Sequence, residues 1–245
     1  MNPPVKAMIL AAGRGERMRP LTDDCPKPLL QVQGKALIDW HVDALARGGV
    51  RELVVNTAWL GEQISSHLDL LRNTGGREEL SFSYSHEGDD FGYALETAGG
   101  IARALPLLGE VFWLLAADVY VPGFEFSPQA VSRFLAGGKL AHLWLVPNPP
   151  HNPRGDFGLD ASGLALNLPA GDPAPRHTYS TIGLYRCELF DSLPFGNSPG
   201  LAVALAPLLR AAMDRRQVSA ELYLGAWTDV GTPERLAELN QHFPN

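Results

Sequence analysis

The sequence predicts an α/β fold, in which helices cover both faces of one mixed, mostly parallel sheet and a small lobe is inserted late in the chain. Two observations carry this prediction. Short apolar runs alternate with amphipathic stretches over most of the length, which is the pattern of strands joined by crossover helices. Closely spaced prolines interrupt that rhythm in about residues 148–187, as expected of an inserted lobe built from loops and short strands.

Apolar runs and helical spacing place the elements of the first half. Helical spacing over residues 36–45 ends at Gly48-Gly49, and further helices are predicted over 61–71 and over about 97–105, where Pro106 stops the last one. The first helix lies between two strands and completes one βαβ unit. The predicted strands cover residues 5–10, 52–55, 80–84, 111–116 and 143–146.

The second half resumes regular structure after the prolines. A strand is predicted over residues 181–185, helical spacing returns over 201–213, and a strand near Leu222 precedes a final helix over 233–242. No internal repeat of fixed period is present. Residues 1–245 are therefore predicted to form a single domain.

Composition excludes several classes of function. The net charge of −7 argues against broad nucleic-acid binding, because duplex affinity needs basic residues that neutralise phosphates over a surface. Cys25 and Cys187 provide neither a disulfide framework nor a metal-ligand spacing, which suits a reducing compartment. No apolar run approaches the ~20 residues of a membrane span, and the N-terminus runs at once into a predicted strand. We therefore expect a cytoplasmic protein that binds small molecules, with no nucleic-acid, membrane or protein partner.

A glycine loop follows the first predicted strand. Small residues stand where the backbone leaves the sheet, so its N–H groups can approach phosphate oxygens without side-chain obstruction. Arg17 and Lys27 follow, and they would add the full charges that backbone dipoles lack. The loop is predicted to bind a triphosphate through Leu10, Ala11, Ala12, Gly13 and Gly15.

Other glycine motifs fail on spacing. A dinucleotide fingerprint needs a third glycine where Met18 stands, and a P-loop needs a Gly-Lys-Ser/Thr run that is absent. For a glycine pair alone, a tight turn with solvated cations is the simpler interpretation. The complete run with both cations favours the phosphate site.

This sequence resembles the sugar-1-phosphate nucleotidyltransferases in the run Leu10-Ala11-Ala12-Gly13-x-Gly15-x-Arg17-Met18-x-Pro20-Leu21-Thr22, followed by Pro26-Lys27-Pro28. The resemblance continues through most of the chain. It implies a Rossmann-like three-layer αβα sandwich with an acceptor-binding lobe, and an enzyme that couples a nucleoside triphosphate to a sugar 1-phosphate with release of pyrophosphate. It also implies a Mg²⁺ cofactor and catalytic roles for Arg17 and Lys27.

Looser matches point to a subgroup of that family. They resemble the short N-acetylmuramate α-1-phosphate uridylyltransferases of bacterial cell-wall recycling, which implies UTP and N-acetylmuramate 1-phosphate as substrates. Glucose, mannose or N-acetylglucosamine 1-phosphate with UTP, dTTP or GTP is the alternative, and the loop 87–96 and the lobe 148–179 would decide between them. The matching segments are residues 56–61, 95–101, 154–157 and 227–232.

Two aspartates are the candidate metal ligands. Asp118 follows a buried apolar run, which puts its carboxylate at the strand edge where ligand crevices of open α/β sheets lie. Asp229 stands just before the last helix, and the resemblance implies that both bind Mg²⁺, which prefers one or two carboxylates plus substrate phosphates. Either aspartate alone would more often be a helix cap or turn residue. Relatives often carry glycine where Ala117 precedes Asp118, so we expect a methyl group against the nucleotide.

Base and sugar contacts are predicted at two places on the same sheet edge. Ala98 and Gly99 open a helix and are expected to offer backbone N–H groups to a flat base. The resemblance adds Glu96 and Thr97 as polar contacts, although Thr97 could simply cap the helix. Asn56 ends the second strand nearby, where an asparagine is otherwise a common turn residue.

Acceptor-binding loops of relatives correspond to the proline-rich lobe of this chain. The resemblance therefore implies that the sugar phosphate meets Arg154, Gly155, Asp156 and Thr181, because functional residues concentrate on loops held by a rigid scaffold. A surface ion pair between Arg154 and Asp156 is an equally good interpretation.

The implied reaction needs no general base. A phosphate monoester with a second pKa near ~6 is largely dianionic at neutral pH, so the absence of a Ser-His-Asp or Cys-His arrangement is expected. His41, His67 and His142 are accordingly predicted to be packing or surface residues. A catalytically silent nucleotide sensor remains an alternative, but a sensor can lose its metal ligands and still bind, whereas this chain retains both Asp118 and Asp229.

Overall fold

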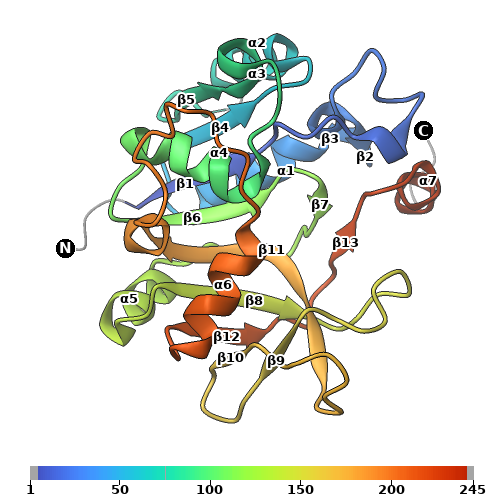
Figure 1. Cartoon of the computed structure of the whole chain (residues 1–245). Coiled ribbons are helices and arrows are strands. Elements are labelled where there is room, and N and C mark those ends of the chain that lie inside the picture. The colour runs from blue at the N-terminus through green and yellow to red at the C-terminus, as the bar shows by residue number, and fades with distance from the viewer. Residues whose placement is uncertain (1–4, 75, 242–245) are drawn as a thin grey trace.

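The computed structural model describes residues 5–74 and 76–241, so the predicted end of the last helix at residue 242 lies outside the described residues. Its centre is a mixed nine-stranded sheet with a parallel core (Figure 1). The predicted strands of this core are present and differ only by one or two residues at an end. Their spatial order is β6 (Val111–Ala116), β1 (Lys6–Leu10), β4 (Glu52–Thr57) and β5 (Ser81–His86).

The long strand β11 (Arg176–Arg186) joins this core to the lobe. It runs antiparallel to β6 on one side and to β8 (Ala141–Val146) on the other, and β12 (Val218–Leu222) extends the sheet beyond β8. Its N-terminal end pairs with β9 (Phe157–Leu159), and β9 pairs in turn with β10 (Ala165–Leu166).

The lobe is therefore shorter than the predicted range 148–187. Residues 183–186 of β11 are in register with 111–114 of β6, and the side chains of Leu184 and Tyr185 are fully buried in the main cores. A strand that is apolar on both faces belongs to the interior of the sheet rather than to an exposed lobe.

Helices cover both faces of the sheet and form the predicted three layers (Figure 1). One face packs against α1 (Leu37–Arg47), α2 (Gly61–Arg72) and α5 (Pro128–Gly137). The other packs against α4 (Glu96–Ala104) and α6 (Leu205–Asp214). Each described helix is too short or too polar to cross a bilayer.

Alternation along each strand supplies both cores. Ala7 and Ile9 of β1 face one layer of helices, and Met8 between them faces the other. In β6, Phe112 and Trp113 are adjacent residues that fill opposite cores at 0% and 1% exposure. Because successive side chains of a strand point to opposite faces, a continuous apolar run is what a doubly covered strand requires. Burying each of these rings contributes about 1.5–3 kcal/mol.

Two of the α-helices were not predicted. The side chain of Ser127 accepts a hydrogen bond from the backbone N–H of Ala130 at 3.2 Å and Pro128 occupies the first turn of α5, which together are a sequence signal for a helix start. Residues 87–96, expected to be a loop, contain α3 (Glu87–Phe91), which Gly92 ends in the left-handed conformation.

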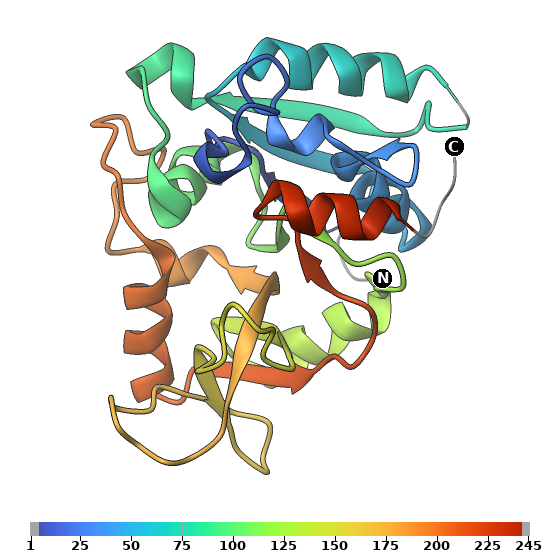
Figure 2. The same cartoon turned by 90° about the vertical axis from the view of Figure 1, so that its right-hand side faces the viewer.

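The C-terminal helix α7 (Pro233–Asn240) lies beside the N-terminal loop region, far from it in sequence (Figure 2). A small apolar cluster joins them, in which Met18 and Leu30 pack with Tyr120, Val230 and Leu236. Two-stranded sheets flank this cluster. They pair β2 (Gln31–Val32) with β3 (Lys35–Ala36), and β7 (Val119–Tyr120) with β13 (Thr228–Asp229).

His41 of α1 supports the strand that follows β6. It is almost fully buried and its Nε2 donates to the Val119 carbonyl oxygen at 2.8 Å. Burial lowers the pKa of His41 from 6.5 to about 4, so the ring is neutral at pH 7. The unfolded chain takes up this proton near pH 6.5 and the folded chain only near pH 4. The unfolded state therefore binds more protons in that window, and the free energy of unfolding falls as the pH drops through it.

We expect this histidine to remove about 2 kcal/mol from the free energy of unfolding between about pH 7.5 and about pH 5. The variant His41→Gln retains an N–H group for the Val119 carbonyl but does not titrate. Urea unfolding at the two pH values should show a smaller pH dependence for the variant than for the wild type. The same pH dependence in both proteins would contradict the assignment.

Candidate active site

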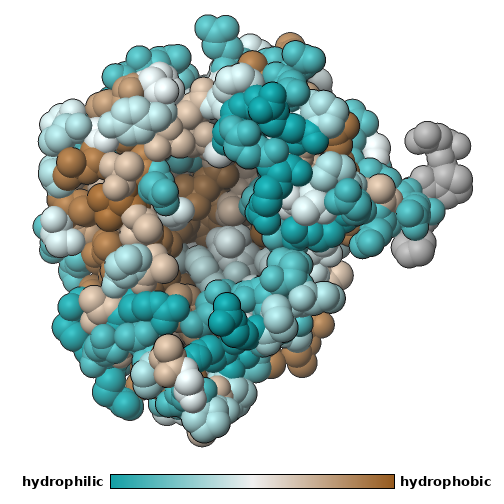
Figure 3. All heavy atoms as spheres, turned by 45° about the vertical axis from the view of Figure 1, so that its right-hand side comes forward, coloured by the Kyte–Doolittle hydropathy of each residue, from teal (hydrophilic) through white to brown (hydrophobic). Residues whose placement is uncertain are grey.

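A cavity of about 400 Å³ opens at the carboxyl ends of β1, β4 and β6. Figure 3 shows this side of the molecule hollowed at its centre, with mainly hydrophobic residues on one wall and hydrophilic residues on the other. Ligand crevices of open α/β sheets lie at this edge. Most predicted site residues line it, namely Leu10, Ala11, Ala12, Gly13, Gly15, Arg17, Lys27, Asn56, Glu96, Thr97 and Asp118.

The glycine loop leaves β1 with a backbone that depends on its glycines. A side chain at Gly13 would meet no atom within 4 Å, so the backbone there is open to a ligand. Gly15 has a φ of 69°, a left-handed conformation that favours glycine. The Thr22 hydroxyl donates to the Gly15 carbonyl at 2.9 Å and holds this turn.

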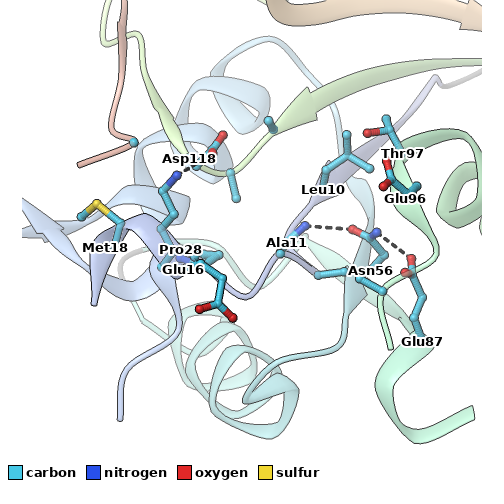
Figure 4. A pocket seen from close by; sticks show the side chains of 18 of the residues that line it. Leu10, Ala11, Glu16, Met18, Pro28, Asn56, Glu87, Glu96, Thr97 and Asp118 are labelled. Atoms are coloured by element: carbon cyan, nitrogen blue, oxygen red, sulfur yellow. Dashed lines mark hydrogen bonds and ion pairs between the residues drawn. The ribbon is translucent and has the colours of Figure 1, made fainter. Parts of the chain in front are cut away.

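Lys27 and Asp118 form a close ion pair next to the loop, and Figure 4 labels Asp118 at this wall of the pocket. Their Nζ and Oδ2 atoms are 2.6 Å apart. Lys27 is only 7% exposed, whereas the Asp118 side chain is 38% exposed, and both line the cavity. A buried ammonium is costly without a partner, and Asp118 provides that partner. The pair thus brings one cation and one carboxylate to the same cavity wall.

Arg17 is the free arginine of the loop. It is exposed at the cavity, and within residues 5–74 and 76–241 no ion pair or hydrogen bond of its side chain is found. Arg14 is already engaged in contacts within the protein. Its guanidinium lies 3.6 Å from the centroid of the Trp59 ring and donates to the Asp23 carboxylate at 3.0 Å. Arg17 is therefore the arginine that can meet an anionic ligand.

Asp229 is brought next to Asp118 through the backbone. Strands β13 and β7 pair so that the N–H of Val230 donates to the carbonyl of Asp118 at 2.9 Å. The Asp229 carboxylate bonds the Arg235 guanidinium at 2.7 Å, and His151 Nε2 lies 3.3 Å away. A side chain at Gly231, which lines the cavity, would lie 2.9 Å from Asp229 Oδ1. The segments of the two aspartates therefore lie side by side, but only Asp118 lines the cavity, and the Asp229 carboxylate is held by Arg235.

Alanine precedes Asp118 in the same wall. Ala116 and Ala117 both line the cavity. Ala117 is 1% exposed, and its N–H donates to the carbonyl of Leu10 at 3.0 Å. The backbone of this wall is thus tied to the glycine loop.

The expectation for Ala98 and Gly99 was wrong in its physical basis. Their N–H groups are not open to a base, because both donate to the carbonyl of Val203 at 2.8 and 3.0 Å. Residues 201–204, predicted as the start of a helix, run extended along α4 instead. A side chain at Gly99 would lie 2.2 Å from the Leu201 carbonyl oxygen, so this glycine permits close packing of the two segments. Neither residue lines the cavity.

Residues of the lobe do not line the cavity in this structure. Gly155 has a φ of 63° and shapes a turn. Asp156 accepts the backbone N–H of Tyr179 at 2.8 Å, so it holds this turn to β11. Arg154 is exposed, and no ion pair with Asp156 is found among the described residues. An acceptor contact by Arg154 stays a prediction.

Thr181 stands at the irregularity of β11, between the residues that pair with β8. It has a φ of 68°, which is strained for a residue with a side chain. Its buried hydroxyl has no hydrogen-bond partner within the described part of the chain. Strained residues often stand at functional sites, but Thr181 is not among the residues that line the cavity.

Comparisons with known proteins identify the family of this chain. A family model described as nucleotidyl transferase matches residues 6–245. The chain belongs to the nucleotidyl transferase family. This nucleotidyl transferase is 47% identical to an N-acetylmuramate alpha-1-phosphate uridylyltransferase of Neisseria meningitidis over 96% of both chains. It is 32% identical to a protein of the same name from Caulobacter vibrioides, over 94% of this chain and 93% of that one.

A solved structure supports the fold of this nucleotidyl transferase. The crystal structure of a Bacillus anthracis protein assigned as a glucose-1-phosphate thymidylyltransferase matches with a TM-score of 0.75. The match covers 96% of this chain and 93% of that one at 20% sequence identity. The α/β fold class predicted from the sequence is thereby confirmed, as are the family and its enzymatic class.

Sequence reasoning missed three residues at this site. Glu87 lines the cavity floor and contacts Asn56, and Arg235 and His151 surround the Asp229 carboxylate. Arg235 had a signal, because the Thr232-Pro233 helix start places it in the first turn of α7, just after Asp229. His151 had no sequence signal, because it lies in a proline-rich loop that only the tertiary fold brings close to Asp229.

Proposed function

We propose that this nucleotidyl transferase joins UTP to N-acetylmuramate α-1-phosphate and releases pyrophosphate, with Mg²⁺ held by Asp118 and Asp229. The observation that carries the choice of substrates is the 47% identity, over nearly the full length of both chains, to the Neisseria meningitidis protein of that name. Such an activity would serve the recycling of cell-wall sugars in the cytoplasm.

The donor set fits Mg²⁺. Asp118 and Asp229 lie on adjacent backbone segments and would supply hard oxygen ligands, and Mg²⁺ commonly takes one or two carboxylates and completes its shell with phosphate oxygens and waters. No group of three or more His, Cys, Asp or Glu side chains that could hold a metal is found in the described residues. A site of this kind therefore depends on substrate oxygens. Bound there, Mg²⁺ would neutralise phosphate charge and help align the reacting groups.

The chain's own residues supply alignment and charge. The acceptor phosphate is already largely dianionic at neutral pH, so its oxygen can attack the α-phosphorus in line while the bond to the pyrophosphate oxygen breaks. The open backbone at Gly13 allows the triphosphate to approach the loop. Lys27 and Arg17 stand at the cavity to neutralise charge on the α-phosphate and the departing pyrophosphate. Glu96 and Thr97 on the facing wall are placed for base or sugar contacts.

A pyrophosphate-release assay tests the proposal. We expect wild-type protein with Mg²⁺, UTP and N-acetylmuramate 1-phosphate to show a kcat/KM at least about tenfold above that with glucose 1-phosphate or with GTP, because each lost polar contact costs about 1–2 kcal/mol. Omitting the sugar phosphate, or adding EDTA, should abolish the signal. A preference for another sugar phosphate or nucleotide would refute the substrate assignment but not the enzymatic class.

A further inference from the structure

A chain of buried hydrogen bonds links the two walls of the cavity (Figure 4). The N–H of Ala11, in the glycine loop, donates to Asn56 Oδ1 at 2.8 Å. The Asn56 amide nitrogen donates to Glu87 Oε1 at 2.7 Å. The N–H of Leu95, just before α4, donates to Glu87 Oε2 at 2.7 Å. Glu87 thus receives a bond from each side.

This chain is buried and closely packed. Glu87 is 0% exposed and Asn56 is 3% exposed. A side chain at Gly100 of α4 would lie 2.5 Å from Glu87 Oε1 and 3.0 Å from Asn56 Nδ2, so helix α4 rests directly on the pair. Hydrogen bonds in such a site are strong, and an unmatched polar group there is costly.

The pattern of donors requires Glu87 to be a carboxylate. Both of its oxygens accept, one from an amide side chain and one from a backbone N–H, and a protonated or amide group would offer a donor at one of these positions. Burial is the largest influence and raises the pKa of Glu87 above its ordinary value, although the bonds from Leu95 and Asn56 partly offset it. The Glu87 carboxylate and the Ala11 N–H together orient the Asn56 amide, with its NH₂ group on Glu87 and its oxygen on Ala11.

The two ends of the chain are parts of the proposed nucleotide site. Ala11 lies where the glycine loop leaves β1, and Leu95 precedes Glu96 and Thr97, which line the facing wall. Glu96 has a φ of 59°, a strained conformation for a residue with a side chain, and the bond of Leu95 to Glu87 anchors the chain immediately before it.

We propose that Glu87 is a positioning residue for nucleotide binding, which sets the glycine loop through Asn56 and the Glu96-Thr97 wall through Leu95. The inference rests on the proposed function, because it assumes that the cavity binds the nucleoside triphosphate. Glu87 does not touch the reacting atoms in this role. It fixes the width and shape of the cavity between two backbone segments.

A polarity swap tests the proposal. In Glu87→Gln one new NH₂ group faces the Asn56 amide or the Leu95 N–H, and in Asn56→Asp two carboxylates face each other. In the double variant Glu87→Gln/Asn56→Asp every donor again has an acceptor, because the new NH₂ group at position 87 donates to the new carboxylate at position 56. Each single variant should raise the KM for UTP about tenfold to hundredfold, with little change in the KM for the sugar phosphate. The double variant should recover most of the loss.

The outcomes separate this inference from the proposed function. Wild-type activity is measured first with each nucleoside triphosphate, and the variants are then assayed with the nucleotide that the wild type uses. If that nucleotide is not UTP, the proposed function is refuted while the positioning role of Glu87 is still tested. Equal KM values for wild type and Glu87→Gln, or a double variant worse than both singles, would overturn the positioning role. Binding of that nucleotide by calorimetry gives a readout independent of turnover.

A second variant covers the case in which Glu87→Gln does not fold, as judged by circular dichroism. Gly100→Ala leaves all three hydrogen-bonding groups in place but pushes a methyl group against Glu87 and Asn56. The KM for the nucleotide should rise at least about threefold while that for the sugar phosphate stays near wild type. A KM that rises equally for both substrates, or not at all, would reject the proposal.

Discussion

Replacing Asp118 or Asp229 by alanine lowers the rate of pyrophosphate release at least about 100-fold if these carboxylates hold the metal. The segments of the two residues pair as β7 and β13, and the N–H of Val230, next to Asp229, donates to the Asp118 carbonyl. In the proposed site one ion takes an oxygen from each carboxylate. Without either carboxylate, phosphate charge in the cavity is less neutralised and the triphosphate is less well aligned. The measurement is kcat with UTP and sugar 1-phosphate over a range of Mg²⁺ concentrations.

Two control variants separate the loss of a metal ligand from a general effect of removing an aspartate. Asp191→Ala removes an exposed aspartate outside the cavity and should keep wild-type turnover. Asp118→Asn retains the shape of the side chain and a partner for Lys27, but not the charge. It should also lose most activity, and a higher Mg²⁺ concentration should recover part of it. Near-normal turnover of both alanine variants would reject the metal role.

Replacing Lys27 by methionine should lower kcat/KM at least about 100-fold, because a preorganised cation in a partly buried site stabilises developing phosphate charge. Lys27 is 7% exposed and its ammonium lies 2.6 Å from Asp118 Oδ2. Its loss removes a positive charge from the cavity and leaves the Asp118 carboxylate facing the triphosphate without a partner. Because Asp118 is more than a third exposed, water screens that charge in the free protein, and the thermal stability should change much less than the activity.

The matched control is Lys139→Met, which removes a partly exposed lysine that donates to the carbonyl of Arg216 away from the cavity. It should leave kcat/KM unchanged. Lys27→Arg keeps the charge on a longer, planar group and should retain intermediate activity. An unaltered kcat/KM for Lys27→Met would mean that this lysine serves only to pair with Asp118.

Several parts of the site that the sequence predicted stand at the ends of strongly apolar strands. The run 111–116 could only be a buried strand, and parallel strands in a doubly covered sheet have their carboxyl ends at a common edge. Leu10 and Asn56 lie at the carboxyl ends of two such strands, Asp118 follows a third, and all three residues line the cavity. The glycine loop was predicted for the same reason, since its small residues follow a strand directly.

Predictions that depended on long-range contacts were less successful. Ala98 and Gly99 were expected to present N–H groups because they open a helix, but residues 201–204 take those groups. Periodicity could not show this, because those residues continue a helical pattern and become extended only where they pack on α4. The predicted end of the lobe at residue 187 was wrong for a similar reason. Strand β11 belongs to the lobe at one end and to the main sheet at the other.

The sequence by itself determined the α/β class, the positions of the core strands and helices, and the residue types at the carboxyl edge of the sheet, because hydrophobic periodicity and glycine chemistry act over a few neighbouring residues. Only the tertiary structure decided which of those residues meet. It paired Lys27 with Asp118, placed Arg235 and His151 on Asp229, and buried Glu87 between Asn56 and Leu95. These contacts join residues far apart in the chain, and their geometry follows from strand order and helix packing, which no local pattern encodes.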